Sequence, residues 1–448
     1  MPPSPINGKQ PNAGWARARS IAAMSQDFGP GPGTWAGPTE GTRRRLHAER
    51  PFLRAQRPPT LAAGRLSIAL DIAPSRKANG IRRLPTLGRR TSPSAVEAVG
   101  EPLIQIGVIG YGYWGPNLVR NFSEIPACRV RAVSDKREGQ LALAVARYPA
   151  ITTTTDCHTL IADPAVDAVV IMTPVSTHFD LALGALQAGK HVLVAKPMAT
   201  SSEQAAVLIQ EAARRNLVLM VDHTFIYTDA VRHIKQLVDD GSLGQLYYYD
   251  SVRVNLGLFQ HDVNVLWDLA VHDLSIMDYV LGEQPRAVAA TGAAHIPGQP
   301  VNLAYLTCFF DSNLLAHHHV NWLAPVKVRR TLVSGERKMI VYDDLEPSEK
   351  VKVYDRGVTL NSEPERVAES LINYRTGDMW APQISLTEGL RVEANHFLEC
   401  IRHGEQPLSD GHAGLRVITL LEAASRSLAQ RGKLVETSSG LARGQLAV

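Results

Sequence analysis

The chain has 448 residues, of which 45% are hydrophobic and 20% are charged, and its formal net charge is +4. This composition is ordinary for a globular protein, and the length allows two domains with sizeable cores. Residues 1–100 hold 16 of the 47 Lys and Arg residues but only 5 of the 43 Asp and Glu residues. The remainder is therefore mildly acidic, which gives no indication of a nucleic-acid partner. No apolar stretch approaches the roughly 18 residues of a membrane span, so we expect no membrane partner.

The first hundred residues hold 13 of the 28 prolines and Arg clusters such as 43–45, with little sustained periodicity. We expect residues 1–100 to form a disordered basic extension. Such a sequence resembles an organelle transit peptide, and it equally resembles translation from a wrongly chosen start codon. Our hypothesis is that the functional protein begins near residues 96–103. Intact-mass analysis of protein from the native gene tests it, because a mass that includes residues 1–95 would reject it.

The first motif that points to a ligand follows a short, largely β-branched run, Ile104–Ile109, which is typical of a buried parallel strand. Gly110, Gly112 and Gly115 then form G-x-G-x-x-G. These glycines allow a tight turn, a close approach of a pyrophosphate to the backbone, and close packing of the next helix. Pro116 suits the first turn of that helix, whose free N–H groups and positive dipole end face the phosphates.

A second apolar strand, 130–134, ends in Asp135, 20 residues after Gly115. A carboxylate at this place accepts hydrogen bonds from the adenosine ribose and repels a 2′-phosphate. The sequence therefore predicts dinucleotide binding, with NAD as the cofactor. NADP is the less favoured alternative, which Lys136 and Arg137 beside the acid keep open.

Strand and helix patterns alternate as far as residue 222, as in a parallel sheet covered by helices. We predict a Rossmann domain over residues 101–222. Its predicted elements after the glycine-rich turn are the strands 130–134, 166–172, 192–194 and 217–221 and the helices 116 onward, 137–147, 178–188 and 203–215.

Two strand ends of this domain carry candidate binding residues. Thr173, Pro174 and His178 follow one strand, and Lys196 follows the next. Open α/β sheets bind ligands at the carboxyl ends of their strands. We therefore expect these four residues to lie at the cofactor.

The pattern changes after residue 223, where predicted strands follow one another and indicate a largely antiparallel sheet. The predicted fold class is α/β, with an N-terminal Rossmann domain and a C-terminal α+β domain, residues 223–448, that has a large open, mostly antiparallel sheet. The predicted strands are 245–255, 286–292, 303–310, 314–322, 326–334 and 338–342, and the predicted helices are 229–238, 265–281, 390–402 and 414–431.

Hydride transfer to a nicotinamide needs a group that takes the alcohol proton and a group that stabilises the oxygen. Lys196 is a candidate because partial desolvation lowers the pKa of a lysine toward neutrality. Asp268 and His272 lie at i and i+4 of a predicted helix, so we expect them to share a face and form a hydrogen bond. A carboxylate beside an imidazole makes a proton acceptor. Taken singly, each of these residues also fits an ordinary solvated position.

Metal binding is not indicated. The four cysteines are scattered with no C-x-x-C pair, which is typical of a reducing compartment and argues against a disulfide framework or a zinc site. The histidine run 317–319 lies in a predicted strand without a partnering cysteine or spaced acid. We predict a cytoplasmic protein with no metal site.

Four motifs stand in order along the chain: Gly110-Tyr111-Gly112-Tyr113-Trp114-Gly115, Thr173-Pro174 with His178, Ala195-Lys196-Pro197, and Asp268 with His272. In this order and spacing they resemble the Gfo/Idh/MocA oxidoreductases, whose members include glucose-fructose oxidoreductase and inositol dehydrogenase. The resemblance covers about residues 101–436.

The resemblance implies that Lys196 and His272 lie at the nicotinamide and are catalytic, with Asp268 beside them on the substrate. It also implies a set of cofactor contacts: Gly110, Gly112, Tyr113, Trp114, Gly115, Asp135, Thr173, Pro174, His178 and Lys196. Two positions depart from the family pattern. Ala195 stands where the family usually has glutamate, which removes a carboxylate able to orient or tune Lys196, and Ala270 stands where it usually has glycine.

Within the family, segments 253–257, 264–268 and 374–378 most resemble the branch that oxidises nucleotide-activated sugars at C3, as in making amino sugars for surface polysaccharide. This implies a UDP-N-acetylhexosamine or its uronic acid as substrate, with Arg253 and Asn255 holding a sugar hydroxyl or a phosphate. The resemblance also implies a homo-oligomer, a dimer or tetramer.

Our leading hypothesis is an NAD-dependent oxidoreductase that acts on a secondary alcohol of a sugar or nucleotide sugar. The alternatives are an inositol or free-sugar dehydrogenase and a non-catalytic protein of the same fold that senses NAD or a sugar.

Overall fold

The structure is a computed structural model that describes residues 102–257, 263–360 and 372–437. All of them belong to one compact unit, residues 89–448. The predicted basic extension, residues 1–100, lies outside the described residues, so the expectation of disorder and the start-site hypothesis stay predictions.

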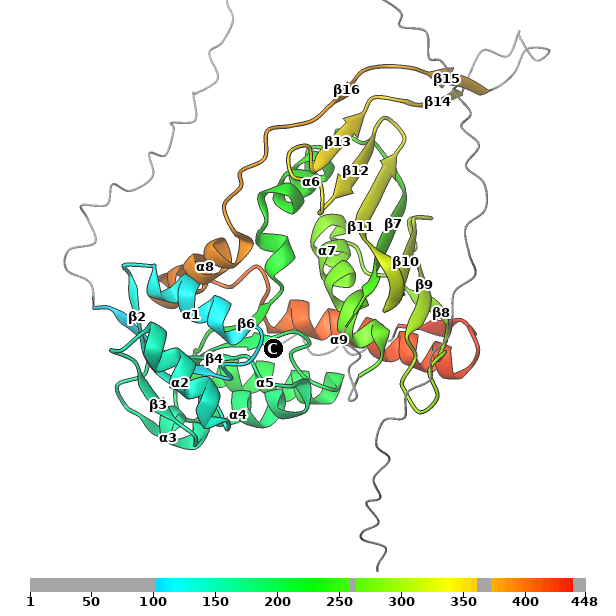
Figure 1. Cartoon of the computed structure of the whole chain (residues 1–448). Helices are drawn as coiled ribbons and strands as arrows, with labels where there is room; N and C mark the ends of the chain where they lie inside the picture. The colour runs from blue at the N-terminus through cyan, green and yellow to red at the C-terminus, as the bar shows by residue number, and fades with distance from the viewer. Residues whose placement is uncertain (1–101, 258–262, 361–371, 438–448) are drawn as a thin grey trace, which may run out of the picture. The chain divides into compact units, whose positions relative to one another are not determined.

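A six-stranded parallel sheet follows the order β3-β2-β1-β4-β5-β6 (Figure 1). The strand order reverses between β1 and β4, and a crevice at such a reversal is where open α/β sheets hold their ligands. The strands are β1 (Ile104–Ile109), β2 (Cys128–Ser134), β3 (Thr152–Thr154), β4 (Ala168–Ile171), β5 (His191–Ala195) and β6 (Leu219–Asp222). Every residue of β4 is buried, as its unbroken apolar sequence predicts for a strand covered on both faces.

Helices connect these parallel strands. They are α1 (Gly115–Ser123), α2 (Glu138–Arg147), α3 (Cys157–Ala162), α4 (His178–Gln187) and α5 (Ser202–Arg215), with a 3₁₀ turn η1 (Val175–Thr177) before α4. α5 shows how local sequence sets helix limits. The Ser201 side chain accepts a hydrogen bond from the Gln204 amide, and the helix ends at Asn216 in the left-handed conformation.

A nine-stranded sheet follows the order β16-β13-β12-β11-β7-β10-β9-β8-β17, and all its pairs are antiparallel except β7 with β10. The predicted fold class is therefore confirmed for both parts of the chain. The strands are β7 (Leu246–Leu256), β8 (Ala287–Ala293), β9 (Leu303–Phe309), β10 (Leu315–Asn321), β11 (Leu323–Gly335), β12 (Met339–Asp343), β13 (Val351–Tyr354), β16 (Met379–Trp380) and β17 (Val435–Glu436). β14 (Gly357–Leu360) and β15 (Ile372–Arg375) form a separate two-stranded ladder.

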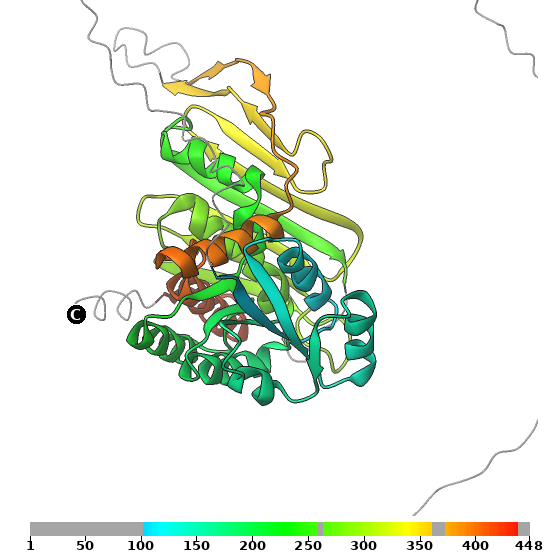
Figure 2. The same ribbon diagram turned by 90° about the vertical axis from the view of Figure 1, so that its left-hand side faces the viewer.

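The remaining helical elements are η2 (Thr224–Tyr227), α6 (Asp229–Asp239), a π-helix η3 (Leu266–Ala270), α7 (Val271–Leu281), α8 (Gly389–His403) and α9 (Gly411–Ala429). α7 and α9 pack together, and α9 also contacts both β8 and α5. α8 packs against α1 on the six-stranded sheet (Figure 2). The ring centroids of Phe122 and Phe397 lie 6.4 Å apart at this contact. The last two helices therefore join the cores of both sheets, and the division at residue 222 remains our proposal.

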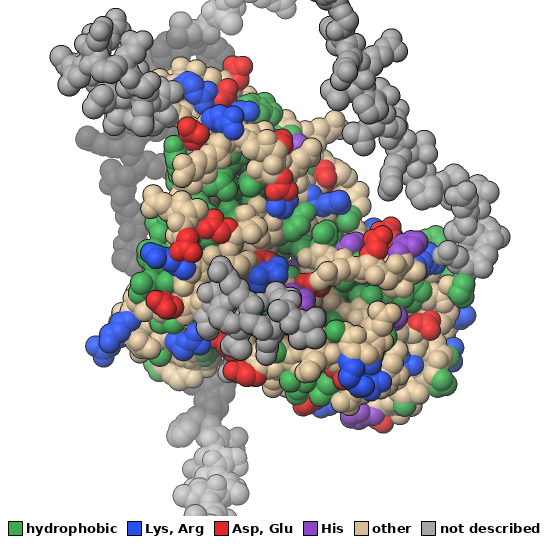
Figure 3. All heavy atoms as spheres, turned by 180° about the vertical axis from the view of Figure 1, so that it is seen from behind, with side chains coloured by type: hydrophobic (Ala, Val, Ile, Leu, Met, Phe, Trp, Pro, Cys, Tyr) green, Lys and Arg blue, Asp and Glu red, His purple; other side chains and the backbone are tan. Residues whose placement is uncertain are grey.

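Figure 3 shows basic, acidic and hydrophobic side chains intermixed over one face of the molecule. Within the described ranges, no helix combines the length and apolarity that crossing a bilayer requires.

Candidate active site

The glycine-rich turn joins β1 to α1 and leaves room for a ligand. Gly110 has φ +96°, and a Cβ on it would collide with the Met172 carbonyl oxygen. A Cβ on Gly115 would likewise strike the carbonyl oxygen of Gly110, so these two glycines let strand and helix approach closely. At Gly112 the nearest atom to an added Cβ is Arg137 Nη2 at 3.3 Å, so space remains beside the backbone. The residues present thus fit a dinucleotide pyrophosphate at the N-terminus of α1.

Asp135 follows β2 at the same edge of the sheet. Its carboxylate accepts hydrogen bonds from the Tyr111 amide at 2.8 Å and from the Arg137 amide and Nε at 2.9 and 3.0 Å. Burial alone would raise the pKa of Asp135, but the bonds from Arg137 lower it below its usual value. The group is therefore an anion, as the predicted ribose contact requires.

Two aromatic residues precede Gly115. Tyr113 is 88% exposed and lies against Trp114, with ring centroids 6.4 Å apart. The Trp114 indole donates to Asp222 Oδ2 at 3.0 Å. Tyr113 is thus free to contact a cofactor, whereas Trp114 anchors the glycine-rich turn to the end of β6.

His178 occupies a different place from the predicted one at the cofactor. Its side chain is buried, and its ring nitrogens lie 2.8 Å from the carbonyl oxygens of Pro197 and Thr173. The Thr177 hydroxyl also donates to Thr173 Oγ1 at 2.7 Å. Because its buried ring lies between these two carbonyl oxygens, one of which accepts its N–H, we correct the prediction for His178 from a cofactor ligand to a brace between the ends of β4 and β5. Thr173 and Pro174 stay predicted cofactor contacts.

Lys196 follows β5 and reaches across to η3. Its Nζ donates to the Asp268 backbone oxygen at 2.8 Å and lies 3.5 Å from Asp268 Oδ1. Burial lowers the pKa of Lys196 below its usual value, while the carboxylate of Asp268 acts in the opposite direction. A lysine of this kind can hold a proton yet exchange it more readily than a surface lysine.

The predicted hydrogen bond between Asp268 and His272 is wrong. Residues 266–270 form a π-helix, and the other carboxylate oxygen of Asp268, Oδ2, accepts from Trp322 Nε1 at 3.0 Å. Asp268 is thereby held between Lys196 and Trp322. Sequence reasoning missed Trp322, because nothing in a local pattern links residues 54 positions apart.

His272 lies at the start of α7. Its Nδ1 is buried and has no hydrogen-bond partner among the described residues, and its ring meets the edge of Phe225 at 5.2 Å. Burial, reinforced by the positive charge of Lys196, lowers the pKa of His272 well below its usual value. The imidazole is therefore neutral at pH 7 and can accept a proton.

Arg253 is not free to hold a substrate, contrary to the prediction. It is buried on β7, and its Nε and Nη2 bind the two carboxylate oxygens of Asp273 at 2.9 and 3.0 Å. Its guanidinium also lies over the Phe225 ring at 4.6 Å. Arg253 thus fixes the wall behind His272, while Asn255, half-buried near the end of β7, stays a predicted substrate contact.

His223, which follows β6, is buried, and burial lowers its pKa to about 4. Neither ring nitrogen has a partner among the described residues. A cavity of about 160 Å³ lies beside it, lined also by Ser275 and by the ion pair of Asp278 with Arg416. A buried imidazole next to a polar cavity of this size is a site for bound water.

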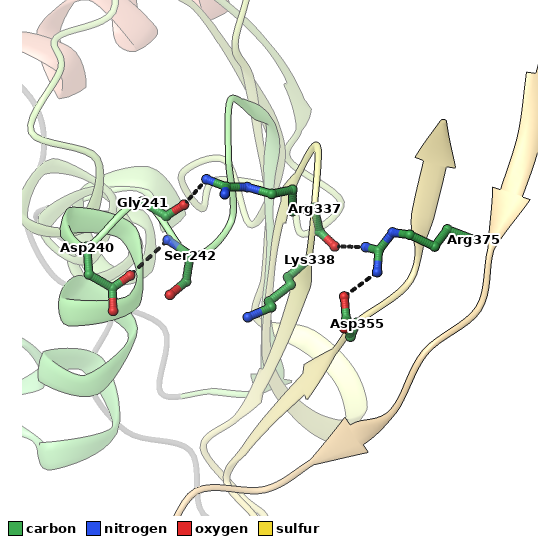
Figure 4. A pocket seen from close by; sticks show the side chains of 7 residues that line it. All are labelled: Asp240, Gly241, Ser242, Arg337, Lys338, Asp355 and Arg375. Carbon is green, nitrogen blue, oxygen red and sulfur yellow. Dashed lines mark hydrogen bonds and ion pairs between the residues drawn. The ribbon is translucent and has the colours of Figure 1, made fainter. Parts of the chain in front are cut away.

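A larger cavity, about 540 Å³, lies away from these residues, between the end of α6 and the turn before β12 (Figure 4). Arg337 reaches the Gly241 carbonyl oxygen and Arg375 pairs with Asp355, while Lys338 extends toward the end of α6. None of the predicted site residues lines this cavity.

Histidines 317–319 alternate across β10, as the strand pattern predicts. His317 and His319 both stack on Tyr305, whereas His318 is buried and its Nδ1 lies 2.7 Å from Ser251 Oγ. Elsewhere, Asp156, Cys157 and His158 bring three possible metal-ligand atoms within 4.8 Å of one another. The Asp156 carboxylate already caps α3 by accepting from the His158 amide, so we assign no metal role there.

Comparison with known proteins gives two family matches. The model of the oxidoreductase family with an NAD-binding Rossmann fold matches residues 104–223, and that of the GFO/IDH/MocA C-terminal domain matches residues 231–341. Together they span about half of the chain.

Individual relatives are more distant. The chain is 23% identical over 350 residues to myo-inositol 2-dehydrogenase from Thermotoga maritima, which covers 73% of this chain and 97% of that protein. It is 27% identical over 323 residues to UDP-N-acetylglucosamine 3-dehydrogenase from Acidithiobacillus ferrooxidans, which covers 70% of this chain and 94% of that protein.

Among solved structures, that UDP-N-acetylglucosamine 3-dehydrogenase matches with a TM-score of 0.62 at 24% identity over 74% of this chain and 99% of that one. GenD2 from gentamicin A biosynthesis, solved in complex with NAD, matches with a TM-score of 0.64 at 22% identity. The match covers 75% of this chain and 97% of GenD2. These structural matches support the fold alone.

Proposed function

Since this chain belongs to the Gfo/Idh/MocA family of NAD-binding oxidoreductases, we propose that it oxidises a secondary alcohol of a sugar or nucleotide sugar. Named dehydrogenases among its relatives identify it as an NAD-dependent dehydrogenase. The observation that carries the proposal is the meeting of a desolvated Lys196, a neutral His272 and Asp268 at the edge where the glycine-rich turn lies.

Each residue would have one task. NAD, when bound, supplies the acceptor of the hydride. His272 takes the hydroxyl proton, because its imidazole is neutral and its Nδ1 has no hydrogen-bond partner among the described residues. Lys196 stabilises the developing negative charge on the substrate oxygen, and Asp268 orients the lysine while contacting the substrate.

The proposed substrate is a UDP-N-acetylhexosamine or its uronic acid, oxidised at C3. The UDP-N-acetylglucosamine 3-dehydrogenase relative, matched over 94% of its length, supports this choice. Two inositol 2-dehydrogenases among the relatives support the second candidate, a free polyol.

NADH formation with a panel of inositols, free sugars and UDP-sugars tests the proposal. NADH with one UDP-sugar would support the nucleotide-sugar branch, and NADH only with free polyols would replace it by the second candidate. A flat panel together with calorimetric NAD binding would reject the tested substrates and leave a different substrate, a tightly held cofactor, or a protein that senses NAD or a sugar.

We also propose a homo-oligomer in the cytoplasm. One face of the nine-stranded sheet exposes Tyr248, Tyr305 and Leu315, whose burial by a second copy would be favourable. The four cysteines, all within the described residues, are free thiols, as expected in a reducing compartment. Light scattering after size exclusion tests the assembly, and a monomeric mass would reject it.

A further inference from the structure

The last residue of β5, directly before Lys196, carries no carboxylate. Ala195, the residue before Lys196, stands where the resembling family usually has glutamate. The neighbouring strand offers a replacement, because β5 and β6 pair in parallel with Ala195 opposite Asp222. Both strands end at these residues, so Asp222 lies at the same sheet edge as the lysine.

Asp222 is buried and accepts two hydrogen bonds from separate elements. Its Oδ2 accepts from the indole of Trp114 at 3.0 Å, and its Oδ1 accepts from the hydroxyl of Thr224. The first bond ties it to the glycine-rich turn, and the second fixes it to the start of η2. Asp222 is therefore held in one orientation by two donors.

Glu393 on α8 lies behind this carboxylate. Its side chain is fully buried and faces the Asp222 carboxylate and the Thr224 hydroxyl. Burial, followed by the negative charge of Asp222, raises the pKa of Glu393 well above its usual value. In its neutral form Glu393 can donate a hydrogen bond to Asp222.

We propose that Asp222 supplies the carboxylate that position 195 lacks, so that one buried group anchors both the glycine-rich turn through Trp114 and the charge of Lys196. Asp222 is thus a positioning residue, and its contribution to catalysis rests on the role proposed for Lys196. The carboxylate of Asp222 is fixed by its hydrogen bond from Trp114. The position of the glycine-rich turn and the charge near Lys196 therefore both depend on this one carboxylate.

The charge balance at Lys196 supports this assignment. Burial lowers the pKa of Lys196, and Asp268 and then Asp222 act to raise it. The titratable and charged groups that act on Lys196 from the surrounding elements are Asp268 on η3, Asp222 on β6, Arg253 on β7, His223 after β6 and His272 on α7. Both histidines are neutral at pH 7 because their pKa values are lowered, so among these groups Asp268 and Asp222 are the ones that raise the pKa of Lys196.

Competitive acetylation followed by mass spectrometry tests the proposal without any substrate, because it gives the pKa of each lysine from the pH dependence of its labelling. We expect Asp222→Asn to lower the pKa of Lys196, raising its labelling rate at neutral pH about threefold to tenfold. Adding Ala195→Glu to that variant returns the rate toward wild type. Exposed lysines in the same sample serve as internal references.

Two further variants separate charge from packing. Glu393→Gln keeps a neutral donor beside Asp222, so we expect wild-type labelling of Lys196. Asp163→Asn removes a remote carboxylate that pairs with Arg131, and it likewise leaves Lys196 unchanged. Unchanged labelling in Asp222→Asn, or no recovery on adding Ala195→Glu, would overturn the proposal.

The second arm of the proposal concerns the cofactor turn. Asp222→Ala and Trp114→Phe each remove the same hydrogen bond. We therefore expect each to weaken NAD binding about threefold to tenfold and the pair to be no worse than either alone. Additive losses would contradict a shared anchor. Full turnover in Lys196→Met would remove the catalytic role of the lysine but would leave both of these binding readouts intact.

Discussion

At the scale of single residues, burial decides which of the polar groups around Lys196 carry charge. Arg253 is buried but keeps its charge because Asp273 accepts two hydrogen bonds from it, whereas His272 has no such partner among the described residues and is neutral. The site thus brings together a proton acceptor, His272, the ammonium group of Lys196 and the carboxylate of Asp268. His272 and Lys196 supply the proton acceptor and the oxygen-stabilising cation that oxidation of an alcohol needs, and Asp268 holds the lysine in place.

Removal of the proposed catalytic groups should affect turnover more than cofactor binding. We expect Lys196→Met and His272→Ala each to lower kcat on the order of a hundredfold, since each removes a group that acts on the reacting oxygen. NAD affinity should change little, because neither residue belongs to the glycine-rich turn. Steady-state kinetics and calorimetry measure the two quantities, and wild-type turnover in either variant would exclude that residue from the mechanism.

The glycine-rich turn allows a variant that affects binding alone. An added methyl group at Gly112 meets only Arg137 Nη2, at 3.3 Å, so Gly112→Ala should leave the melting temperature near wild type. The same methyl group fills the space where the pyrophosphate would approach, so NAD binding should weaken about tenfold or more. Gly184→Ala is the matched control, because nothing lies within 4 Å of its added Cβ. Equal NAD affinity in both variants would remove Gly112 from the cofactor site.

At the scale of elements, β7 and α7 are joined by a buried ion pair. Arg253 and Asp273 have side chains only 5% and 4% exposed. Arg253→Met leaves the Asp273 carboxylate buried without its partner, so we expect a loss of about 3 kcal/mol in the free energy of unfolding. Urea unfolding measures it.

Two controls accompany this prediction. Arg131→Met breaks an exposed pair with Asp163 and should cost less than about 1 kcal/mol. Arg253→Met combined with Asp273→Leu should recover most of the loss, because no uncompensated charge remains. Similar losses in the Arg253 and Arg131 single variants would contradict a special contribution of the buried pair.

The elements also separate what a sequence pattern can predict from what it cannot. Strands with a clear apolar pattern and glycine-rich turns were predictable because they depend on neighbours along the chain, and both sheets contain the predicted strands. The short strands β3, β13, β16 and β17 were not predicted. The pairing of Asp268 with His272 assumed α-helical spacing, which the π-helix at 266–270 replaces. Likewise, Arg253 was assigned to substrate because a half-exposed strand and a strand covered by α7 look alike in sequence.

At the scale of the whole molecule, the six-stranded sheet depends on helices from the end of the chain. α8 closes the core over α1, and α9 contacts α5 and β8, so these cores are completed by segments more than 100 residues away in the sequence. No local pattern reports such contacts. We infer that the two sheets unfold together, because each core includes side chains from these helices.

Because the fold is cooperative, its buried histidines should affect how the free energy of unfolding changes at acid pH. Burial lowers the pKa of both His223 and His318 to about 4 in the folded chain, against about 6.5 when unfolded. The unfolded chain then binds more protons, so their contribution is complete above pH 6.5 and is lost as the pH falls toward 4. Each group should remove on the order of 3 kcal/mol over this window, which urea unfolding at a series of pH values measures. The variant His223→Asn with His318→Asn should flatten that slope, whereas His403→Asn, at the exposed end of α8, should not. An unchanged slope in the double variant would mean that carboxylates elsewhere set the acid limit of the fold.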